Sequence, residues 1–291
     1  MSADLPLVSV LTPSFNQARW LGDNLASVAR QTYPRIEHVV MDGASTDGSV
    51  GVLERHAGDR CLWRSEPDTG QSDAINKAYR ASHGEILGWL NSDDAYFRDD
   101  VVGAAVDLFS RRPDVAVVYG HAVLIDAAGS VLHTMWVPAY RRRLLRFHDF
   151  IVQPATFIRR SVLGAAMVDE AFEYMMDYEL WLRLARSYAF ARLPRIIAVD
   201  RHHRGRKSYT RLDLAAIDLK RLVEMYRIDD HPALRPVRKA LNVAIRLEGL
   251  GLVRDAASLS TSTGTASPSW QALAARQLLV PRSRMKDRTG P

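Results

Sequence analysis

The segment GEILGWLNSDD, residues 84–94, is an apolar run that stops abruptly at polar side chains. The run from Ile86 to Leu90 predicts a strand that is buried on both faces of a sheet. Two adjacent carboxylates, Asp93 and Asp94, follow it, and their mutual repulsion and lost solvation must be offset. A hard divalent cation with oxygen ligands would offset both. A surface turn with a helix cap is the alternative interpretation, because Asp and Asn favour turns and caps.

Three further apolar runs upstream of this segment also end in polar or turn residues. They are Leu7 to Leu11, His38 to Met41 and Leu62 to Arg64. Segments with helical spacing lie between the runs, at residues 18–31, 47–56 and 72–81. This alternation predicts an α/β fold with a mostly parallel sheet flanked by helices. Ligands bind at the carboxyl ends of such strands, so the polar residues there predict a binding site.

The second half of the chain has a less regular pattern. We expect helices at residues 99–111 and 178–185, strands at 116–119 and 194–199, a hairpin of 121–126 with 130–136, and a strand at 150–159 that Pro154 bends. From residue 212 the pattern is helical to about residue 259. The predicted organisation is one α/β domain over residues 5–210, a helical extension over 211–259, and a flexible linker and tail over 260–291 with one short helix.

The composition is typical of a soluble globular protein, with 47% hydrophobic and 25% charged residues. Cys61 is the only cysteine, so no internal disulfide can form, and we expect a reducing compartment. No apolar run reaches the roughly 18 residues of a membrane span and no signal peptide is recognised, which predicts a cytoplasmic protein. The net charge of +6 indicates phosphate-bearing ligands, an anionic membrane surface or nucleic acid as a neighbour. No recognised nucleic-acid-binding motif supports the last of these.

Taken together, the motifs resemble those of family 2 glycosyltransferases with the GT-A (Rossmann-like) fold. The similar segments are VSVLTPSFN (8–16), LASVARQTYPRIEHVVMDGASTDGS (25–49), EPDTGQSDAINKAYRASHGEILGWLNSDD (66–94), QPATFIRR (153–160), MMDYELWLRLA (175–185) and HRGRKS (203–208). The resemblance covers roughly residues 5–210 and implies transfer of a sugar from a nucleotide diphosphate donor, with a UDP-sugar favoured, to an acceptor hydroxyl. It further implies inversion at the anomeric carbon, a saccharide or lipid-linked acceptor, and a role in cell-surface polysaccharide or glycolipid synthesis.

The resemblance implies a divalent cation, Mg²⁺ or Mn²⁺, at the donor diphosphate. Asp93 stands at the last position of the metal-binding DxD motif of the family and is the expected ligand. The first position is Asn91, which brings no charge. Asp94 is either a second ligand or the cap of the following turn. His203 is either a metal ligand or a phosphate contact.

The resemblance also implies which residues bind the nucleotide sugar. Asp42 matches the acidic residue of the family near the base or ribose, where a carboxylate accepts hydrogen bonds from base N–H groups or ribose hydroxyls. Asp73 is equally well explained as a helix cap. The other expected contacts are Pro13, Ser14, Asn16, Asp68, Gln71, Asn91, Ser92, Gln153 and Lys207.

Asp177 is the expected catalytic base. An acceptor hydroxyl has a high pKa, so a positioned carboxylate must remove its proton as the hydroxyl attacks. Asp177 precedes the helical segment YELWLRLA at the position of the catalytic Asp of the family, although Met176 replaces the Glu that often comes before it.

Several alternatives remain open at this stage. A processive synthase usually has membrane spans and a Gln-x-x-Arg-Trp motif, and neither is found here. A nucleotidyltransferase would need a Gly-rich, Arg-containing phosphate loop in place of Thr12 to Asn16. A nucleotide-sugar-binding protein without catalysis is conceivable because of Asn91. The helical region 212–259 has a partly apolar face flanked by arginines, which predicts either peripheral contact with the inner face of an anionic membrane or packing against the catalytic domain.

Overall fold

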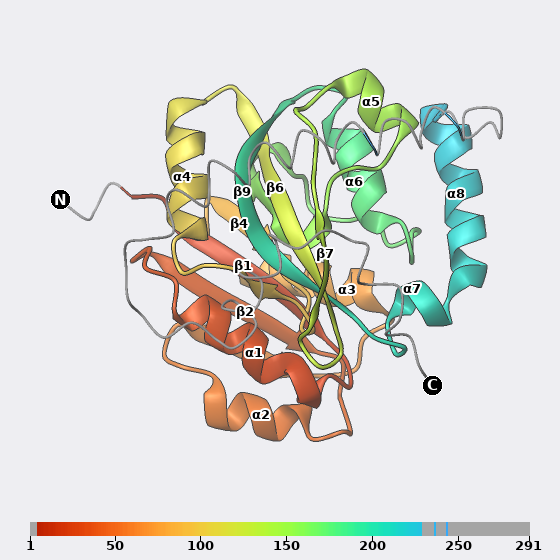
Figure 1. Cartoon of the computed structure of the whole chain (residues 1–291). Helices are drawn as coiled ribbons and strands as arrows, with labels where there is room; N and C mark the ends of the chain where they lie inside the picture. Colours follow the sequence, from red (N-terminus) through yellow and green to blue (C-terminus); the bar gives the residue numbers. More distant parts are fainter. Residues whose placement is uncertain (1–4, 229–235, 237–242, 244–291) are drawn as a thin grey trace.

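A computed structural model describes residues 5–228 together with Pro236 and Val243. Within this part of the chain lies one sheet of nine strands in the order β3-β2-β1-β4-β8-β6-β9-β5, with β7 paired to β6 beside this path (Figure 1). The strands are β1 (Val8–Ser14), β2 (Ile36–Asp42), β3 (Cys61–Ser65), β4 (Ile86–Trp89), β5 (Ala95–Tyr96), β6 (Val115–Asp126), β7 (Val131–Met135), β8 (Thr156–Arg159) and β9 (Ala189–His202). The helices are α1 (Ala18–Ala29), α2 (Ser49–His56), α3 (Gln71–Ala81), α4 (Val101–Arg111), α5 (Arg142–Phe147), α6 (Met176–Leu184), α7 (Lys207–Thr210) and α8 (Leu212–Tyr226), with 3-10 turns η1 (Gln153–Ala155) and η2 (Arg160–Val162). The predicted α/β class is confirmed.

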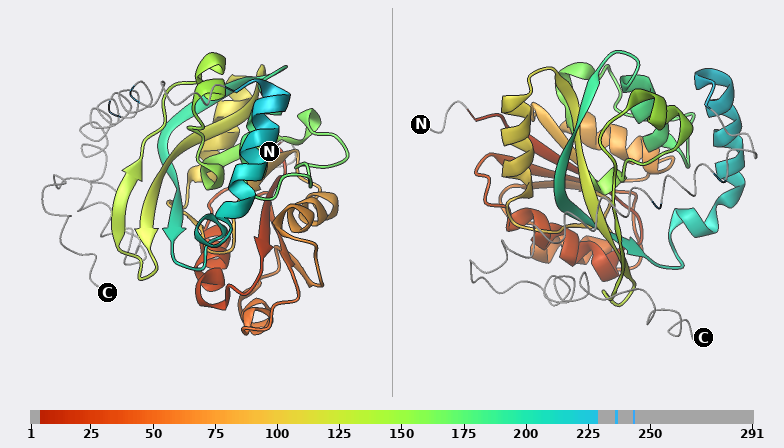
Figure 2. Two further views of the ribbon diagram at one scale, coloured as in Figure 1. Left: turned by 90° about the vertical axis from the view of Figure 1, so that its right-hand side faces the viewer. Right: turned by 45° about the horizontal axis from the view of Figure 1, so that its top comes forward.

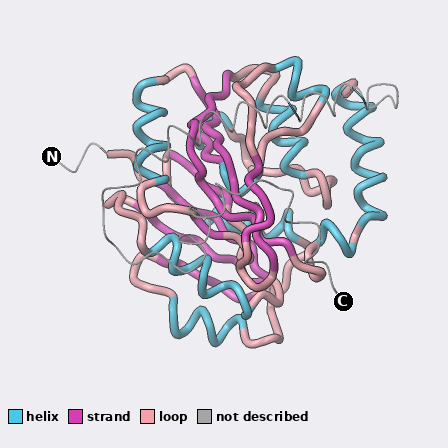
Figure 3. The backbone as a smooth tube through the Cα atoms, in the orientation of Figure 1, coloured by secondary structure: helices cyan, strands magenta, loops and turns pink. Residues whose placement is uncertain are grey.

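The first four strands form a parallel half of the sheet, in which β1 lies between β2 and β4. Neighbouring residues of β2 pack on opposite helix layers: Val39 belongs to the cluster that contains the apolar residues of α3, and Val40 to the cluster of α1 and α2. Strands covered on both faces are apolar throughout, as the runs in the sequence predict. Figure 3 shows these strands in the middle of the molecule with helices around them.

The other half of the sheet is mixed. β8 is antiparallel to both β4 and β6, whereas β9 is parallel to β6 and antiparallel to β5. The predicted parallel arrangement therefore holds for β1 to β4 and for the pair β6 and β9, and the other pairs of this half are antiparallel. The two short strands predicted at 116–119 and 121–126 are one strand of 12 residues, β6. Gly120 continues it because the missing side chain leaves room for Ile197 of β9.

Two further predictions for this half are confirmed. β6 pairs with β7 as the expected hairpin. Pro154 interrupts the expected strand 150–159: it lies in η1, and the strand β8 begins only at Thr156. The predicted strand 194–199 is longer than expected, because β9 runs from Ala189 to His202 along the whole length of β6.

The C-terminal helical region begins with α8, which stands beside α6 at the side of the molecule (Figure 2). Helix α8 ends at Tyr226, where Arg227 has a left-handed backbone with φ 51°. The remainder of the extension, the linker at 260–269 and the short helix at 270–279 lie outside the described residues. Among the helices of residues 5–228, none has the length and apolar character needed to cross a membrane.

Candidate active site

The loop after β4 carries the two adjacent carboxylates, of which Asp94 is buried and Asp93 is partly exposed. Asp94 is only 2% exposed, and its Oδ1 accepts a hydrogen bond of 3.0 Å from the backbone N–H of Arg201 in β9. Burial, together with the charges of Asp93 and Asp200, raises the pKa of Asp94 well above its ordinary value. The alternative of a solvent-exposed turn is therefore wrong for Asp94: its carboxylate joins two strands of the sheet.

Asp93 pairs with His203, which lies 110 positions further along the chain. Its Oδ2 lies 2.9 Å from Nε2 of His203, where an N–H donates to the carboxylate. The imidazole is only 7% exposed, and its ring centroid lies 4.0 Å from the centroid of Trp20 in α1. Arg201 also holds this loop, because its Nε donates to the backbone oxygen of Asp93 at 3.0 Å. The two metal ligands expected from the sequence are thus brought together.

Arg206 lies among several carboxylates. Its guanidinium pairs with Asp200 at 2.5 Å. Burial opposes a charged guanidinium, yet Asp200, Asp94 and Asp93 together raise the pKa of Arg206. Burial raises the pKa of Asp177, and the nearby charge of Arg206 opposes that effect. We call Asp93, Asp94, Asp177 and Asp200 the acidic cluster, and Arg206 is the cation shared by its members.

The donor atoms suit a cation that is completed by a diphosphate. Asp93 and His203 supply one carboxylate and one imidazole, a pair that Mn²⁺ accepts readily and that leaves most coordination positions for phosphate and water. No group of three or more His, Cys, Asp or Glu side chains arranged for a metal is found among the described residues. These residues therefore fit a substrate-bridged cation rather than a closed protein cage.

Asn91 is held by other side chains of the site. Its Oδ1 accepts hydrogen bonds of 3.0 Å from both Trp89 Nε1 and Gln71 Nε2. Its Nδ2 donates to Gln153 Oε1 at 2.8 Å, while Gln153 Nε2 donates to the backbone oxygen of Trp89 at 2.6 Å. Three residues expected at the donor, Gln71, Asn91 and Gln153, thus form one network at the end of β4. A carboxylate in place of Asn91 could not donate to Gln153, which explains why an amide is found here.

The end of β2 forms a second polar loop. Asp42 is 1% exposed, and its carboxylate accepts hydrogen bonds from Ser45 Oγ at 2.6 Å and from Ser65 Oγ at 2.7 Å. Asn16 follows β1 in a left-handed turn with φ 53°, and its Oδ1 accepts from the Thr46 N–H at 2.9 Å. Because Ser14 and Asp42 are register partners, the loops after β1 and β2 lie side by side. These residues build one rim of the site.

Phe15 is an aromatic residue of this rim that the sequence did not single out. It is 59% exposed, although it directly follows the buried strand β1. A side chain at Gly43 would stand 2.5 Å from Asp68 Oδ2 and 3.2 Å from the Phe15 ring, so these three residues meet closely. Burial raises the pKa of the Asp68 carboxyl, and a hydrogen bond from the Gly70 N–H opposes that effect. An exposed ring next to acceptor oxygens offers a flat platform for a nucleobase.

The remaining residues expected at the donor lie in β1, in the loop after β4 and at the start of α3. Pro13 is buried in β1, and the buried hydroxyl of Ser14 has no hydrogen-bond partner among the described residues. Ser92 is buried beside Asp93. Asp73 accepts a hydrogen bond of 3.1 Å from the Thr69 N–H and lies 3.3 Å from Lys77 Nζ, so its carboxylate is engaged within the start of α3.

Asp177 lies in the first turn of α6, and its Oδ1 accepts a hydrogen bond of 2.8 Å from the Tyr178 N–H. Burial raises the pKa of Asp177 to about 6, against the opposing effects of that N–H and of Arg206. Asp149, in the loop after α5, has its own pKa raised by the surrounding protein atoms and by the charge of Asp177. A carboxylate with a pKa near neutrality beside a cation is suited to proton transfer.

Lys207 follows Arg206 in the basic loop and is the first residue of α7. Its Nζ is 3.4 Å from Glu173 Oε2, in the segment that leads into α6. Burial lowers the pKa of the ammonium group, and Glu173 partly compensates. Lys207 is thus brought to the site, in company with an acidic residue that the sequence did not single out.

The sequence also left out Arg206 and Asp200 as individual site residues. Arg206 belongs to the basic loop RHHRGRKS, and Asp200 comes directly before it. The sequence shows that this loop is basic but does not distinguish among its members. The signal that separates them is burial: Arg204 is exposed, whereas Asp200 is 7% exposed and pairs with Arg206. Burial depends on the pairing of β9 with β6, which the sequence pattern does not specify.

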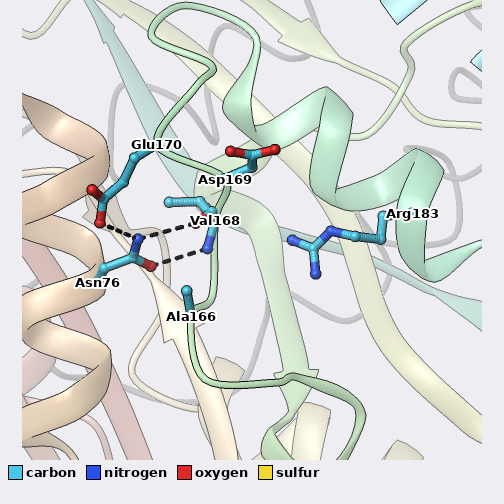
Figure 4. Close-up of a pocket in the computed structure, with 6 residues that line it drawn as sticks. All are labelled: Asn76, Ala166, Val168, Asp169, Glu170 and Arg183. Carbon is cyan, nitrogen blue, oxygen red and sulfur yellow. Dashed lines mark hydrogen bonds between the residues drawn. The ribbon is translucent and has the colours of Figure 1, made fainter. Parts of the chain in front are cut away.

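A separate cavity of about 320 Å³ lies between α3 and α6, lined by Asn76, Ala166, Val168, Asp169, Glu170 and Arg183 (Figure 4). Asn76 Nδ2 donates to the Val168 oxygen at 3.0 Å and to Glu170 Oε1 at 2.9 Å. Its Oδ1 accepts from the Val168 N–H at 3.1 Å. The buried amide therefore serves to hold the loop before α6, and none of the predicted site residues lines this cavity.

The profile of glycosyl transferase family 2 matches residues 9–165, which is more than half of the chain. An uncharacterized glycosyltransferase of Mycobacterium tuberculosis is 40% identical over 186 residues, or 62% of this chain and 69% of that protein. Chondroitin synthase of Escherichia coli is 27% identical over 214 residues, or 72% of this chain but only 31% of that enzyme.

Two solved structures share the fold. TarS 1–349 of S. aureus, in complex with UDP-GlcNAc, is 17% identical, with a TM-score of 0.62 over 88% of this chain and 76% of that chain. The mannosyltransferase PcManGT from Pyrobaculum calidifontis, in complex with GDP-Man and Mn²⁺, is 21% identical, with a TM-score of 0.60 over 94% of this chain and 80% of that chain. The GT-A fold expected from the sequence is thereby confirmed.

Proposed function

Since this chain belongs to glycosyl transferase family 2 and is a glycosyltransferase, we propose that it transfers a sugar from a nucleoside diphosphate donor to an acceptor hydroxyl with inversion. The observation that carries this proposal is the Asp177 carboxylate in the first turn of α6. It is close enough to Arg206 to interact with that charge, and its pKa is about 6. A base with a pKa near neutrality is ionised at physiological pH and still able to accept a proton.

The nucleoside is bound at the rim formed by the loops after β1 and β2. Phe15 stacks on the base, and Asp42 accepts hydrogen bonds from base N–H groups or ribose hydroxyls in place of those that it receives from Ser45 and Ser65. We favour a UDP-sugar as donor. TarS, with the same fold, binds UDP-GlcNAc, although PcManGT binds GDP-Man.

The diphosphate lies over the acidic cluster. Arg206 and Lys207 face its negative charge, and a guanidinium pairs with two phosphate oxygens at once. Asp93 and His203 would hold a divalent cation, Mg²⁺ or Mn²⁺, which when bound neutralises further phosphate charge. The binding of Mn²⁺ by PcManGT supports this part of the proposal.

The reaction is a single displacement. The acceptor oxygen forms a bond to the anomeric carbon while its proton passes to a carboxylate oxygen of Asp177. The bond from the anomeric carbon to the diphosphate oxygen breaks on the opposite side, and Arg206 and Lys207 stabilise the charge that develops on the leaving group. Attack from the side opposite the leaving group inverts the anomeric configuration.

The acceptor is proposed as a saccharide or lipid-linked hydroxyl in cell-surface polysaccharide or glycolipid synthesis. The likeness to chondroitin synthase, a polysaccharide-forming enzyme by name, supports this class. Cytoplasmic residence with peripheral attachment to an anionic membrane stays a prediction. The arginine-flanked helical region on which it rests lies mostly in residues 229–259, outside the described residues apart from Pro236 and Val243.

The test compares Asp177→Asn with the unchanged protein, using UDP-GlcNAc and GDP-mannose with Mn²⁺ as donor probes. We expect release of nucleoside diphosphate to fall by about 10²- to 10⁴-fold, the usual contribution of a general base. Donor affinity measured by calorimetry should stay within a factor of two. Asp213→Asn, at an exposed carboxylate in the first turn of α8, is the matched control. Full turnover by Asp177→Asn would show that another group is the base.

A nucleotide-sugar-binding protein without catalysis is the second candidate. The uncharged Asn91, already engaged with four neighbouring side chains, favours it over a strongly metal-dependent enzyme. Calorimetric binding of a donor probe by the unchanged protein with no release of nucleoside diphosphate, and none of transferred sugar, would select this alternative.

A further inference from the structure

Asp218 of α8 is a buried carboxylate that binds the segment leading into α6. It is 2% exposed, and its Oδ2 accepts three backbone hydrogen bonds: from Glu173 at 3.0 Å, Tyr174 at 2.7 Å and Met175 at 3.0 Å. Three successive N–H groups that converge on one oxygen form an anion-binding nest. The segment 173–175 ends where α6 begins, two residues before Asp177.

We propose that Asp218 is a positioning residue, which acts on the reaction by fixing the backbone from which Asp177 reaches the acceptor. This inference rests on the proposed function, because it takes Asp177 as the base. It also gives α8 a part in the chemistry, although the sequence separates that helix from the domain that carries the motifs.

The opposite side of the same segment is attached to the donor-binding half. Ser72 Oγ, at the start of α3, donates to the Phe172 oxygen at 2.8 Å. Glu173 lies next to Gly70, where an added side chain would stand 3.3 Å from its Oε1. Residues 172–175 are therefore clamped between α3, which contributes Gln71 to the site, and Asp218 of α8.

Helix α8 contacts the base-carrying region at two further points. Arg221 donates to the backbone oxygen of Ala171, and the Tyr226 hydroxyl donates to Glu179 Oε1 at 2.5 Å. Glu179 is itself 1% exposed and pairs with Arg183 at 3.1 Å. Helix α8 thus holds the chain both before and after Asp177.

The contacts at Asp218 and at Tyr226 differ in what they control. Tyr226 binds Glu179 in the first turn of α6, whereas Asp218 binds the non-helical segment before that turn. A helix turn keeps its shape through its own hydrogen bonds, whereas residues 173–175 depend on the carboxylate for their N–H groups. Removal of Asp218 should therefore release the segment next to the base and leave α6 folded.

The experiment uses the full chain with Asp218→Ala and Asp218→Asn, and Asp213→Asn as the exposed control on the same helix. Hydrogen exchange of the peptide that covers 172–180 should become faster in Asp218→Ala and stay unchanged in the control. With UDP-GlcNAc or GDP-mannose and Mn²⁺, kcat should fall by about 10- to 100-fold in Asp218→Ala, since misplacement by about 1 Å costs as much. KM for the donor should change less than twofold, and Asp218→Asn, which keeps one acceptor oxygen, should recover part of kcat.

The Asp177→Asn background separates positioning from a general loss of structure. If Asp218 acts through Asp177, the substitution Asp218→Ala should lower the residual rate of Asp177→Asn no further. Unchanged exchange at 172–180, an unchanged kcat, or an equal loss of kcat in both backgrounds would each overturn the inference. If Asp177→Asn keeps full turnover, the assignment of the base fails, and this inference fails with it.

Discussion

The two halves of the sheet present their functional residues in different ways. In the parallel half, Asp42 ends β2, and the groups that hold its carboxylate are close in the chain: Ser45 and Ser65 lie 3 and 23 positions away. In the mixed half, His203 reaches Asp93 across 110 positions of sequence, and Arg201 reaches Asp94 across 107. The donor side of the site is thus built from local motifs, whereas the base and the basic loop depend on long-range strand pairing.

This comparison predicts that substitutions in the mixed half lower turnover, whereas those in the parallel half weaken donor binding. The largest effect beyond that of Asp177 is expected for Arg206→Ala. It removes the positive charge that stabilises the leaving diphosphate. We therefore expect kcat to fall by roughly 10²-fold, the usual effect of losing one such group. Steady-state release of nucleoside diphosphate measures this loss.

Arg204→Ala is the control for Arg206, because Arg204 lies in the same loop and is exposed. Arg206→Lys should recover only part of the rate, since an ammonium group cannot pair with two phosphate oxygens at once. An Arg206→Ala enzyme with unchanged kcat and weakened donor affinity would place Arg206 with the donor-binding residues instead.

Asp177→Asn should also make the protein more stable at neutral and alkaline pH. The folded-state pKa of Asp177, about 6, lies above the ordinary 3.8, so the stability that the protonated form supplies is complete below about pH 4 and is lost as the pH rises through 6. Asn does not ionise and avoids this loss, which amounts to roughly 1–3 kcal/mol for a shift of about two units.

Urea unfolding at pH 4 and pH 8 measures this difference. The unfolding free energies of Asp177→Asn and of the unchanged protein should converge at pH 4 and separate at pH 8. If Asp177→Asn lowered the unfolding free energy at both pH values, the folded protein would stabilise the ionised carboxylate of Asp177, which contradicts a raised pKa.

In the parallel half, Phe15→Ala should weaken donor binding by about tenfold, since stacking of a base on an aromatic ring contributes about 1–3 kcal/mol. The effect should fall on Kd for UDP, measured by calorimetry, with kcat nearly unchanged. Leu62→Ala removes another exposed apolar side chain, on β3, and should leave Kd unchanged. A loss of kcat in Phe15→Ala without a change of Kd would remove Phe15 from the nucleoside pocket.

The smallest effect is expected for Asn91→Asp. It deprives Gln153 of a donor and sets a third carboxylate near Asp94, so without a divalent cation it should destabilise the protein by about 1–2 kcal/mol. Excess Mn²⁺ should restore part of this loss if the cation binds at Asp93. Asn91→Ala loses the hydrogen bond to Gln153 and also those that Asn91 accepts from Trp89 and Gln71, but it adds no charge and should not respond to Mn²⁺. An equal response of both variants would contradict a cation at this place.

The sequence predicted the parallel half well because β1, β2 and β4 are largely buried and end at or lead into distinctive polar residues, such as Asp42 and Asp93. It predicted Asp177 and His203 only through the resemblance to a family. Arg206 and Asp218 were not predicted, because their importance arises from burial against residues far along the chain. Asn91 and Asp73 were expected at the donor, and both are engaged in contacts within the protein.

The pH dependence of kcat/KM with a nucleotide-sugar donor tests the central claim most directly, since it reports the ionisation of the free enzyme. An ionised Asp177 is required to accept the acceptor proton, so kcat/KM should rise tenfold per pH unit on the acid side and level off above about pH 6. Asp177→Asn should abolish this rise. A rate that does not change between pH 5 and pH 8, or a rise that persists in Asp177→Asn, would contradict the account.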